Sequence, residues 1–250
     1  MDTARRPAPI RAILFDKDGT LIDFDRTWGP AVQAVLRRLS RGDDVLFRKL
    51  SSVSGLLDNG RFLLDSPLID EPTSVFAGRC AALLGKTADA SFVREIDRQL
   101  CDATTAHLSL IGDPKTVLTE LAARGYRLGL LTNDAEATAR AHARKMGLDQ
   151  MLAFIAGYDS EFGAKPAAGP VLAFASAVGV STAEVAVIGD TELDAVTARS
   201  AGARALLVLT GPKSSQLLQQ TGVDAVIASI SDLPAWLDRN GQHRSMSEKS

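Results

Sequence analysis

The sequence predicts an α/β fold built on a doubly wound parallel sheet, and two patterns along the chain lead to this prediction. Short apolar runs recur at intervals, as expected for strands that are buried on both faces of a parallel sheet. Most of these runs are separated by amphipathic stretches of helical period, and alternating strands and helices are typical of doubly wound sheets. The apolar runs span residues 10–15, 127–131, 151–156, 184–188, 203–209 and 225–228.

Three of the intervening helices have recognisable ends. One begins at Pro114 and stops at Gly125, and another begins at Pro170 and stops at Gly179. These ends match the preference for proline in the first helical turn and for glycine just after the last. Thr191 can cap a third helix, which ends before the fifth predicted strand. Each helix therefore fits between two predicted strands.

The interval between the first and second predicted strands is much longer than a normal crossover and contains no convincing strand. Its apolar residues instead form three stripes of helical spacing, the first directly behind Gly29-Pro30. An insertion with its own apolar faces is expected to fold as a small helical domain. We predict a core of residues 1–23 and 111–240, a helical domain over 24–110 and a disordered polar tail over 241–250. The stripes are Val32, Val35, Leu36 and Leu39; Val75, Phe76, Cys80, Leu83 and Leu84; and Phe92, Val93, Ile96 and Leu100.

The composition argues against several classes of protein. Of the 250 residues, 46% are hydrophobic, which is enough to bury a full core. Lys and Arg number 28 against 30 Asp and Glu, so no basic surplus favours nucleic acid or an anionic membrane surface. No apolar run approaches the roughly 20 residues of a membrane span, and residues 1–11 lack the apolar stretch of a signal peptide. We expect a cytoplasmic monomer or homodimer without nucleic-acid or membrane partners.

The strongest motif, Asp16-Lys17-Asp18-Gly19-Thr20-Leu21, follows the first predicted strand directly. Ligands and chemistry in open α/β sheets gather at the carboxyl ends of the strands. Two carboxylates two residues apart, followed by a glycine, suit a Mg2+ site because Mg2+ prefers a few hard oxygen ligands. A strand that ends in a solvated acidic turn is the structural alternative.

Polar residues also follow three later strands. The stretch Thr132-Asn133-Asp134 follows the second strand, where a hydroxyl and backbone amides at a helix start can hold phosphate oxygens. Gly163-Ala164-Lys165-Pro166 follows the third strand, and Asp190 and Asp194 stand at a helix start after the fourth. Taken singly, each stretch also has a purely structural explanation, namely a helix cap, a surface lysine and acids favoured by the helix dipole.

Together, the four stretches resemble the four ordered motifs of the haloacid dehalogenase (HAD) superfamily: DxDGT, a threonine or serine, a lysine before proline, and GDxxxD. The resemblance runs from Ile10 to Leu237 and includes the order, the spacing and the strand-end positions. It implies a Rossmann-like, HAD-like core with an inserted α-helical cap. The insertion looks like the cap of phosphoglycolate phosphatase and its relatives. Such a cap would close over the site and exclude water, which implies a small phosphorylated metabolite as the substrate.

The resemblance also implies how the first motif would act. Asp16 would be the nucleophile and would form an aspartyl-phosphate, while Asp18 would serve as general acid and then as general base. Mg2+ would bind the side chain of Asp16, the backbone carbonyl of Asp18 and the side chain of Asp190. The predicted activity is therefore hydrolysis of a phosphate monoester, such as a phosphoglycolate-like or sugar phosphate.

The other motifs would supply phosphate contacts. Thr132, Asn133 and Lys165 would bind the transferring phosphoryl group, and Lys165 would also neutralise Asp16. Asp194 would not bind the metal directly but would orient Lys165 or the water molecules at the metal. His107 and His142 are interpreted as packed or solvated helical residues.

Several alternatives remain open beside the phosphatase. Members of the superfamily that cleave carbon–halogen bonds lack an acid/base aspartate two residues after the nucleophile, so Asp18 disfavours that chemistry. Phosphoryl transfer of the β-phosphoglucomutase type and phosphonate hydrolysis through a cap lysine are enzymatic alternatives. A receiver-like or phosphate-binding protein is the non-enzymatic one. Trp28 and Trp236 are interpreted as packing residues, and Arg26, Lys49 and Arg61 as solvated cations.

Overall fold

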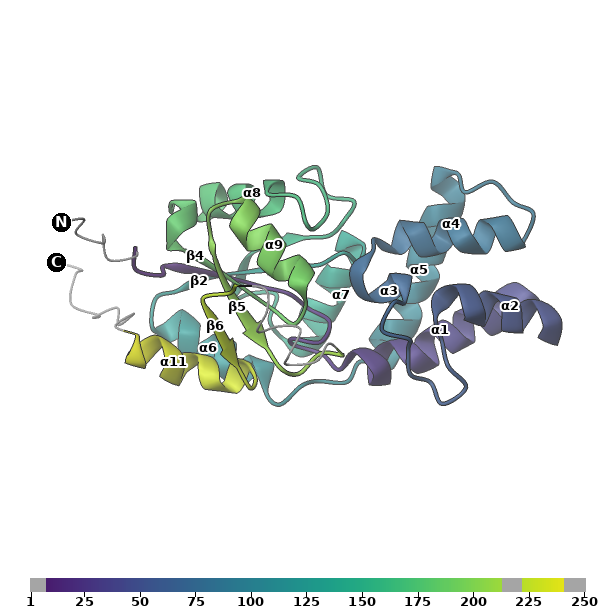
Figure 1. Ribbon diagram of the computed structural model, residues 1–250, viewed down its shortest axis with the longest axis horizontal. Coiled ribbons are helices and arrows are strands. Elements are labelled where there is room, and N and C mark those ends of the chain that lie inside the picture. Colours follow the sequence, from purple (N-terminus) through teal and green to yellow (C-terminus); the bar gives the residue numbers. More distant parts are fainter. Residues whose placement is uncertain (1–7, 213–221, 241–250) are drawn as a thin grey trace.

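The computed structural model describes residues 8–212 and 222–240, which form one six-stranded parallel sheet flanked by helices (Figure 1). The strand order is β3-β2-β1-β4-β5-β6. This is the order of a Rossmann-like doubly wound sheet, so the predicted fold class is confirmed. All six predicted apolar runs contain a strand: β1 (Ala12–Phe15), β2 (Arg127–Leu131), β3 (Leu152–Ala156), β4 (Val185–Gly189), β5 (Arg204–Val208) and β6 (Ala225–Ile227).

Both faces of the sheet are buried under helices (Figure 1). Successive side chains of a strand point to opposite faces, so Ile13 and Phe15 join one hydrophobic cluster while Ala12 and Leu14 join another. Burial on both faces explains why the strands have continuous apolar sequences. The first face is covered by α6 (Pro114–Ala123), α7 (Glu136–Met146) and α11 (Leu233–Arg239), and the second by α8 (Gly169–Val178) and α9 (Glu192–Ser200).

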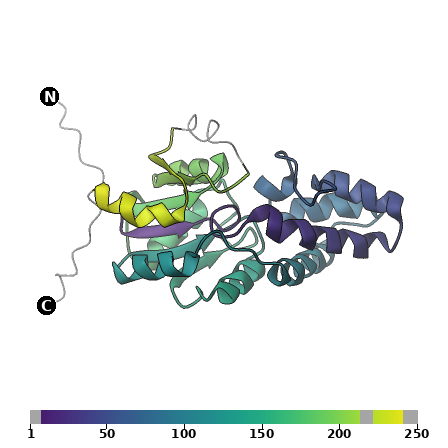
Figure 2. The ribbon, with the colours of Figure 1, turned by 90° about the horizontal axis from the view of Figure 1, so that it is seen from below.

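Of the six helices between β1 and β2 in the sequence, the first five stand beside one end of the sheet layer (Figures 1 and 2). Their inward faces share a third hydrophobic cluster that includes Trp28, Phe76 and Ile96. The three predicted stripes lie in α1, α4 and α5, whereas α2 and α3 lie where no stripe was identified. The helices are α1 (Phe24–Ser40), α2 (Asp44–Ser54), α3 (Pro67–Asp70), α4 (Thr73–Leu83) and α5 (Ala90–Ala106).

Helix α1 begins earlier than its apolar stripe indicated. The stripe placed the start behind Gly29-Pro30, but the helix begins at Phe24 because the Asp23 side chain caps the first turn. Pro30 therefore lies inside the helix. Gly29 is required for close packing, because a Cβ at this position would lie 2.1 Å from the carbonyl oxygen of Gly60.

The sheet topology brings the carboxyl ends of β2, β1 and β4 side by side at the edge that faces the helical insertion. Within the described residues, no helix is both long and apolar enough to cross a membrane. The predicted tail over residues 241–250 lies outside the described residues.

Candidate active site

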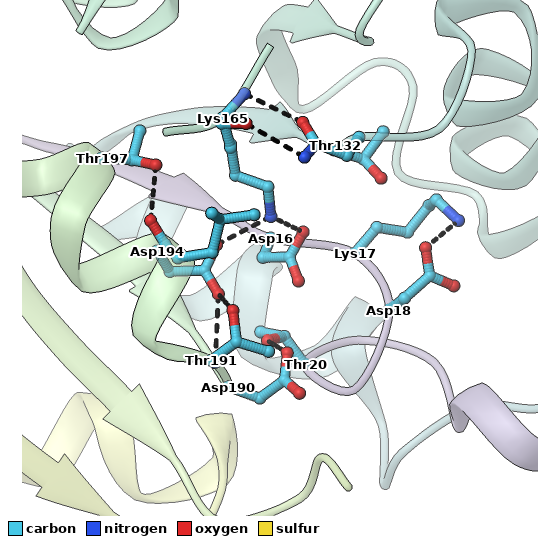
Figure 3. Close-up of polar contacts among 12 residues, drawn as sticks. Asp16, Lys17, Asp18, Thr20, Thr132, Lys165, Asp190, Thr191, Asp194 and Thr197 are labelled. Carbon is cyan, nitrogen blue, oxygen red and sulfur yellow. Dashed lines mark hydrogen bonds and ion pairs between the residues drawn. The ribbon is translucent and has the colours of Figure 1, made fainter. Parts of the chain in front are cut away.

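Polar residues that follow three adjacent strands meet at the carboxyl edge of the sheet (Figure 3). Asp16 follows β1, Thr132 follows β2 and Asp190 follows β4, and β1 lies between the other two strands. Lys165 reaches the same place from the loop after β3. All four side chains are buried. The structure thus brings together one residue from each of the four motifs identified in the sequence.

Lys165 bridges two carboxylates at the centre of this group. Its Nζ donates to Oδ1 of Asp16 and to Oδ1 of Asp194, each at 2.7 Å. Burial lowers the pKa of Lys165, but the attraction of Asp16 and Asp194 outweighs burial and holds the pKa well above its usual value. The ammonium is therefore a fixed positive charge beside Asp16.

The carboxylate oxygens of Asp16, Asp190 and Asp194 lie within 4.8 Å of one another. Burial raises the pKa of Asp16 to about 7 against the attraction of Lys165, and burial with the neighbouring carboxylates raises that of Asp190 well above its usual value. When all three carboxylates are ionised, they and the Lys165 ammonium carry a net charge of −2, which one divalent cation would neutralise. A buried set of hard oxygen atoms with this charge fits Mg2+.

Glycine is required where the backbone passes the Asp190 carboxylate. Gly19 has a φ of +76°, and a Cβ there would lie 2.3 Å from Oδ2 of Asp190. A Cβ at Gly211 would lie 1.7 Å from the same oxygen. Two loops can therefore close around Asp190 only because both carry glycine at the contact.

Asp194 is held at both of its carboxylate oxygens. Oδ2 accepts hydrogen bonds from the backbone N–H of Thr191 at 3.2 Å and from its hydroxyl at 3.0 Å. The backbone contact is one half of the capping box of α9, in which the Thr191 side chain in turn accepts from the backbone N–H of Asp194. Oδ1 accepts from Lys165. Asp194 thus fixes the start of α9 and the direction of the lysine at the same time.

Thr132 and Asn133 occupy the loop after β2. The Thr132 hydroxyl oxygen accepts a hydrogen bond from the backbone N–H of Asp134 at 3.2 Å. The Asn133 side chain accepts from the backbone N–H of Lys165 at 2.9 Å and donates to the carbonyl oxygens of Lys165 and Asp70 at 3.2 and 3.0 Å. The Asn133 amide therefore fixes the lysine loop and joins it to α3.

Asp18 lies apart from the other carboxylates and points toward Lys17 (Figure 3). Its Oδ2 accepts from Nζ of Lys17 at 2.5 Å, and its Oδ1 accepts from Nε1 of Trp28 at 2.6 Å. Trp28 does pack in the insertion, as the sequence suggested, but its contact with Asp18 was missed. An indole N–H carries no sequence signal that distinguishes a packed ring from a donor.

Lys17 is fully buried and lies between two carboxylates. Its Nζ is also 3.2 Å from Oδ2 of Asp134. Burial lowers the pKa of Lys17, but Asp18 and Asp134 raise it further, so the net change is upward. Burial raises the pKa of Asp134 to about 7 despite the attraction of Lys17. The variable position of the first motif thus supplies a second buried cation.

Comparison with known proteins identifies the family. Residues 10–202 match the model of the haloacid dehalogenase-like hydrolases. The chain belongs to this family. Phosphoglycolate phosphatase of Rhodospirillum rubrum is 27% identical over 245 residues, which cover 95% of this chain and 98% of that protein. Phosphoglycolate phosphatase of Chromobacterium violaceum is 29% identical over 224 residues, which cover 90% and 95% respectively.

Solved structures of HAD proteins share the fold of this hydrolase. A HAD phosphatase from Thermococcus onnurineus aligns with a TM-score of 0.67 at 22% identity and covers 94% of this chain and 100% of its own. A HAD family hydrolase from Deinococcus radiodurans, solved with bound phosphate and sodium, aligns with a TM-score of 0.64 at 20% identity. It covers 94% of this chain and 98% of its own. These similarities show a shared fold over most of the chain.

The helical insertion of this HAD hydrolase covers the site at the carboxyl edge of the sheet. A cavity of about 20 Å³ remains between Asp16, Thr132 and Lys165 on one side and the insertion on the other, which is room for roughly one water. The backbone N–H of Thr73 donates to the carbonyl oxygen of Asn133 at 3.3 Å, which ties α4 to the sheet side. On the insertion side, the cavity is lined by Trp28, Leu68, Ile69, Glu71 and Thr73.

Proposed function

We propose that the chain is a Mg2+-dependent phosphatase that hydrolyses a small phosphate monoester through an aspartyl-phosphate on Asp16. The observation that carries this proposal is the Lys165 bridge between Asp16 and Asp194 beside a carboxylate cluster of matching charge for one divalent cation. The relatives named phosphoglycolate phosphatase support the reaction class, because they cover nearly the whole chain. The cytoplasm is the proposed location.

In the first step, an oxygen of Asp16 attacks phosphorus and forms an O–P bond while the ester P–O bond breaks. The electron pair of the broken bond stays on the leaving oxygen, which takes a proton from Asp18 and departs as an alcohol. Lys165 stabilises the negative charge of the phosphoryl oxygens, and the Thr132 hydroxyl donates to one of them. Asn133 contributes by holding the Lys165 loop in place.

In the second step, water attacks phosphorus of the aspartyl-phosphate on the same face from which the alcohol left. Asp18 takes a proton from this water, the bond between phosphorus and Asp16 breaks, and inorganic phosphate is released. Asp16 returns to its carboxylate form and Asp18 returns to its acid form. Asp16 therefore forms the covalent bond to phosphorus, and Asp18 transfers the protons.

The side chains of Asp16 and Asp190 and the backbone carbonyl of Asp18 would hold Mg2+. When bound, the ion neutralises the repulsion between the Asp16 carboxylate and an anionic phosphate, which otherwise disfavours their approach. Asp194 remains paired with Lys165 and Thr191 and orients the lysine.

We further propose that residues 24–110 act as a cap that opens to admit the ester and closes during reaction. The space of about 20 Å³ between the sheet edge and the insertion is too small for a phosphate monoester, which supports a movement of the insertion during substrate entry. Contacts that would break on opening include Thr73 with Asn133. Closure would exclude bulk water during the first step, in which Asp16 accepts the phosphoryl group.

The cap side of the cavity favours a leaving group without negative charge. The described residues that line it from the insertion include Leu68, Ile69 and Glu71 but no lysine or arginine. Arg79 is nearby through its contacts with both Glu71 oxygens at 3.0 and 3.1 Å, and it is engaged by them. A carboxylate on the leaving group would therefore lack a counter-charge, so a neutral sugar or polyol phosphate fits better than phosphoglycolate.

The decisive experiment is Mg2+-dependent phosphate release from p-nitrophenyl phosphate, glycerol 1-phosphate, sugar phosphates and phosphoglycolate. Asp16→Asn and metal chelation should each abolish release, while Asp232→Asn, a change at an exposed aspartate, should leave it unchanged. Accumulation and consumption of a bisphosphorylated sugar would instead indicate a mutase. Absence of release from every ester would refute the phosphatase proposal.

A further inference from the structure

Trp28 and Lys17 hold the proposed acid and base, Asp18, from two different parts of the molecule. Lys17 belongs to the loop after β1, whereas Trp28 belongs to α1 of the helical insertion. Each donates to a different oxygen of the Asp18 carboxylate, at 2.5 Å for Lys17 and 2.6 Å for Trp28. Two donors on opposite oxygens fix both the position and the plane of a carboxylate.

Both donors are themselves immobilised. Trp28 is 1% exposed, and its ring stacks on Phe24 with a centroid separation of 5.9 Å inside the apolar cluster of the insertion. Lys17 is 0% exposed, pairs with Asp134 and lies 5.5 Å from the centre of the Trp28 ring. A side chain locked by packing and by a second contact is well suited to orient a reacting group.

The two contacts leave Asp18 able to exchange a proton. Each carboxylate oxygen can accept about two hydrogen bonds, and Lys17 and Trp28 each occupy one position on one oxygen. The Asp18 side chain is 18% exposed and lines the cavity, so the carboxyl group can be reached from there. The contacts therefore orient the carboxyl group without blocking the face that must reach the leaving oxygen.

From this geometry we infer that Trp28 and Lys17 are positioning residues for Asp18, and that Trp28 couples the position of the helical insertion to the orientation of the acid. When the insertion is closed, the indole N–H aligns Asp18 with the leaving oxygen; when it opens, α1 carries the donor away. The inference rests on the proposed phosphatase function. It goes beyond that function by assigning a task to two residues that do not touch phosphorus.

The dependence of kcat/KM on the leaving group distinguishes a positioning role from a purely structural one. An alkyl phosphate expels a strongly basic oxygen that needs a proton, whereas p-nitrophenyl phosphate expels a weakly basic one that needs little help. The parameter kcat/KM covers the steps up to departure of the leaving group, so it reports on Asp18 as an acid. Poor alignment of Asp18 should therefore impair the alkyl ester more than the nitrophenyl ester.

The experiment compares kcat/KM for glycerol 1-phosphate and p-nitrophenyl phosphate in the native chain and in Trp28→Phe, which keeps a ring but lacks the N–H. We expect the ratio of the two values to fall by roughly 10- to 100-fold, the cost typical of a misplaced catalytic group. Trp236→Phe, on the far helix α11, is the matched control and should leave the ratio and both activities unchanged.

A second variant separates the lost donor from the lost ring volume. Benzothienylalanine at position 28 replaces the indole N–H by sulfur and keeps the size of the ring, so it should reproduce the fall in the ratio. Lys17→Met combined with Asp134→Asn removes the second donor to Asp18 without leaving the Asp134 carboxylate buried and unpaired, and the same fall in the ratio is expected. Circular dichroism and thermal unfolding check that each variant is folded.

Two results would overturn the inference. If the two esters lose kcat/KM by the same factor in the folded variants, Trp28 and Lys17 serve packing alone. If the ratio stays at its native value in the benzothienylalanine variant, the indole N–H does not orient Asp18. Native protein that hydrolyses no ester of the full panel would refute the phosphatase proposal, and the inference with it, whereas native activity with an unchanged ratio in the variants refutes the inference alone.

Discussion

The Nζ atom of Lys165 lies 2.7 Å from Oδ1 of Asp16, although 149 residues separate them in the chain. The same nitrogen lies 2.7 Å from Oδ1 of Asp194, so one cation serves two buried carboxylates. Burial and the nearby carboxylates of Asp194 and Asp18 raise the pKa of Asp16, so Lys165 is what favours its ionised, nucleophilic form in the absence of a metal. The pair is therefore central to both the stability and the proposed chemistry of the site.

Lys165→Met should lower both activity and stability. Removal of one partner from a buried ion pair typically costs about 3–5 kcal/mol in the free energy of unfolding, because the remaining charge is left uncompensated. Phosphate release should fall by about 100-fold or more, since the phosphoryl oxygens lose a charged donor. Urea unfolding and steady-state kinetics measure the two effects. Lys115→Met, which removes an exposed lysine of α6, should alter neither, and an equally stable Lys165→Met chain would contradict the role of the pair.

Mg2+ should stabilise the native chain through Asp190. A ligand at 100 times its dissociation constant adds about 2.7 kcal/mol to the free energy of unfolding when it binds only the folded state. Asp190→Asn keeps the shape of the side chain but removes a negative charge from the cluster, so it should abolish most of this gain. Thermal unfolding with and without Mg2+ measures it, with Asp232→Asn as the control. A full Mg2+ response in Asp190→Asn would place the metal elsewhere.

His142 should make the protein less stable in mild acid. Burial, with a smaller contribution from Lys17, lowers its pKa from 6.5 to about 2. Its Nε2 lies 3.0 Å from the hydroxyl oxygen of Thr104, while Nδ1 is buried without a partner among the described residues. The folded state therefore keeps this imidazole neutral, whereas the unfolded chain takes up a proton below about pH 6.5.

The sign of the effect follows from this difference. The contribution of neutral His142 to the free energy of unfolding is fully present above pH 6.5. It is lost progressively as the pH falls toward 2, by about 1.4 kcal/mol per pH unit. When the pH falls from 6.5 to 5, the free energy of unfolding should therefore decrease by about 2 kcal/mol more in the native chain than in His142→Gln. The exposed His107→Gln variant should keep the native slope. Identical slopes for all three chains in urea titrations would contradict the burial argument.

Much of the fold could be predicted from the sequence because the strands are buried on both faces and the helix ends carry proline, glycine and capping residues. The start of α1 was placed too late, because Gly29-Pro30 was interpreted as the start although Asp23, a typical N-cap residue, precedes Phe24. The close approach of Gly29 to Gly60, by contrast, involves a loop far along the chain that the sequence does not indicate. Helix α3 was missed because four residues are too few to show a stripe. Helix α2 does carry apolar residues at helical spacing, Leu46, Phe47, Leu50 and Val53, so the sequence contained a signal that was not used. The boundaries of the insertion at residues 24 and 110 stay a prediction.

The four motifs indicated which residues meet, because a parallel sheet brings the ends of neighbouring strands together. The motifs did not indicate which other residues contact the reacting groups and orient them. Lys17 stands at the variable position of the first motif, and its ion pair with Asp134 becomes visible only when β1 and β2 are adjacent. The assignment of Asn133 to phosphate stays a prediction, while its contacts with the Lys165 loop were not foreseen. Sequence spacing identifies the reacting groups more readily than the residues that orient them.

Substrate charge provides a last prediction. Glu71 lines the cavity and holds Arg79 through both carboxylate oxygens, so the nearest cap cation is occupied. Glu71→Gln should free Arg79 to contact a carboxylate on the leaving group. The ratio of kcat/KM for phosphoglycolate to that for glycerol 1-phosphate should then rise by about two- to fivefold, the scale of a partly exposed ion pair. The double variant Glu71→Gln with Arg79→Gln is the matched control and should show no such rise. If the native chain already prefers phosphoglycolate, or the double variant gains as much as the single one, a group other than Arg79 recognises the leaving group.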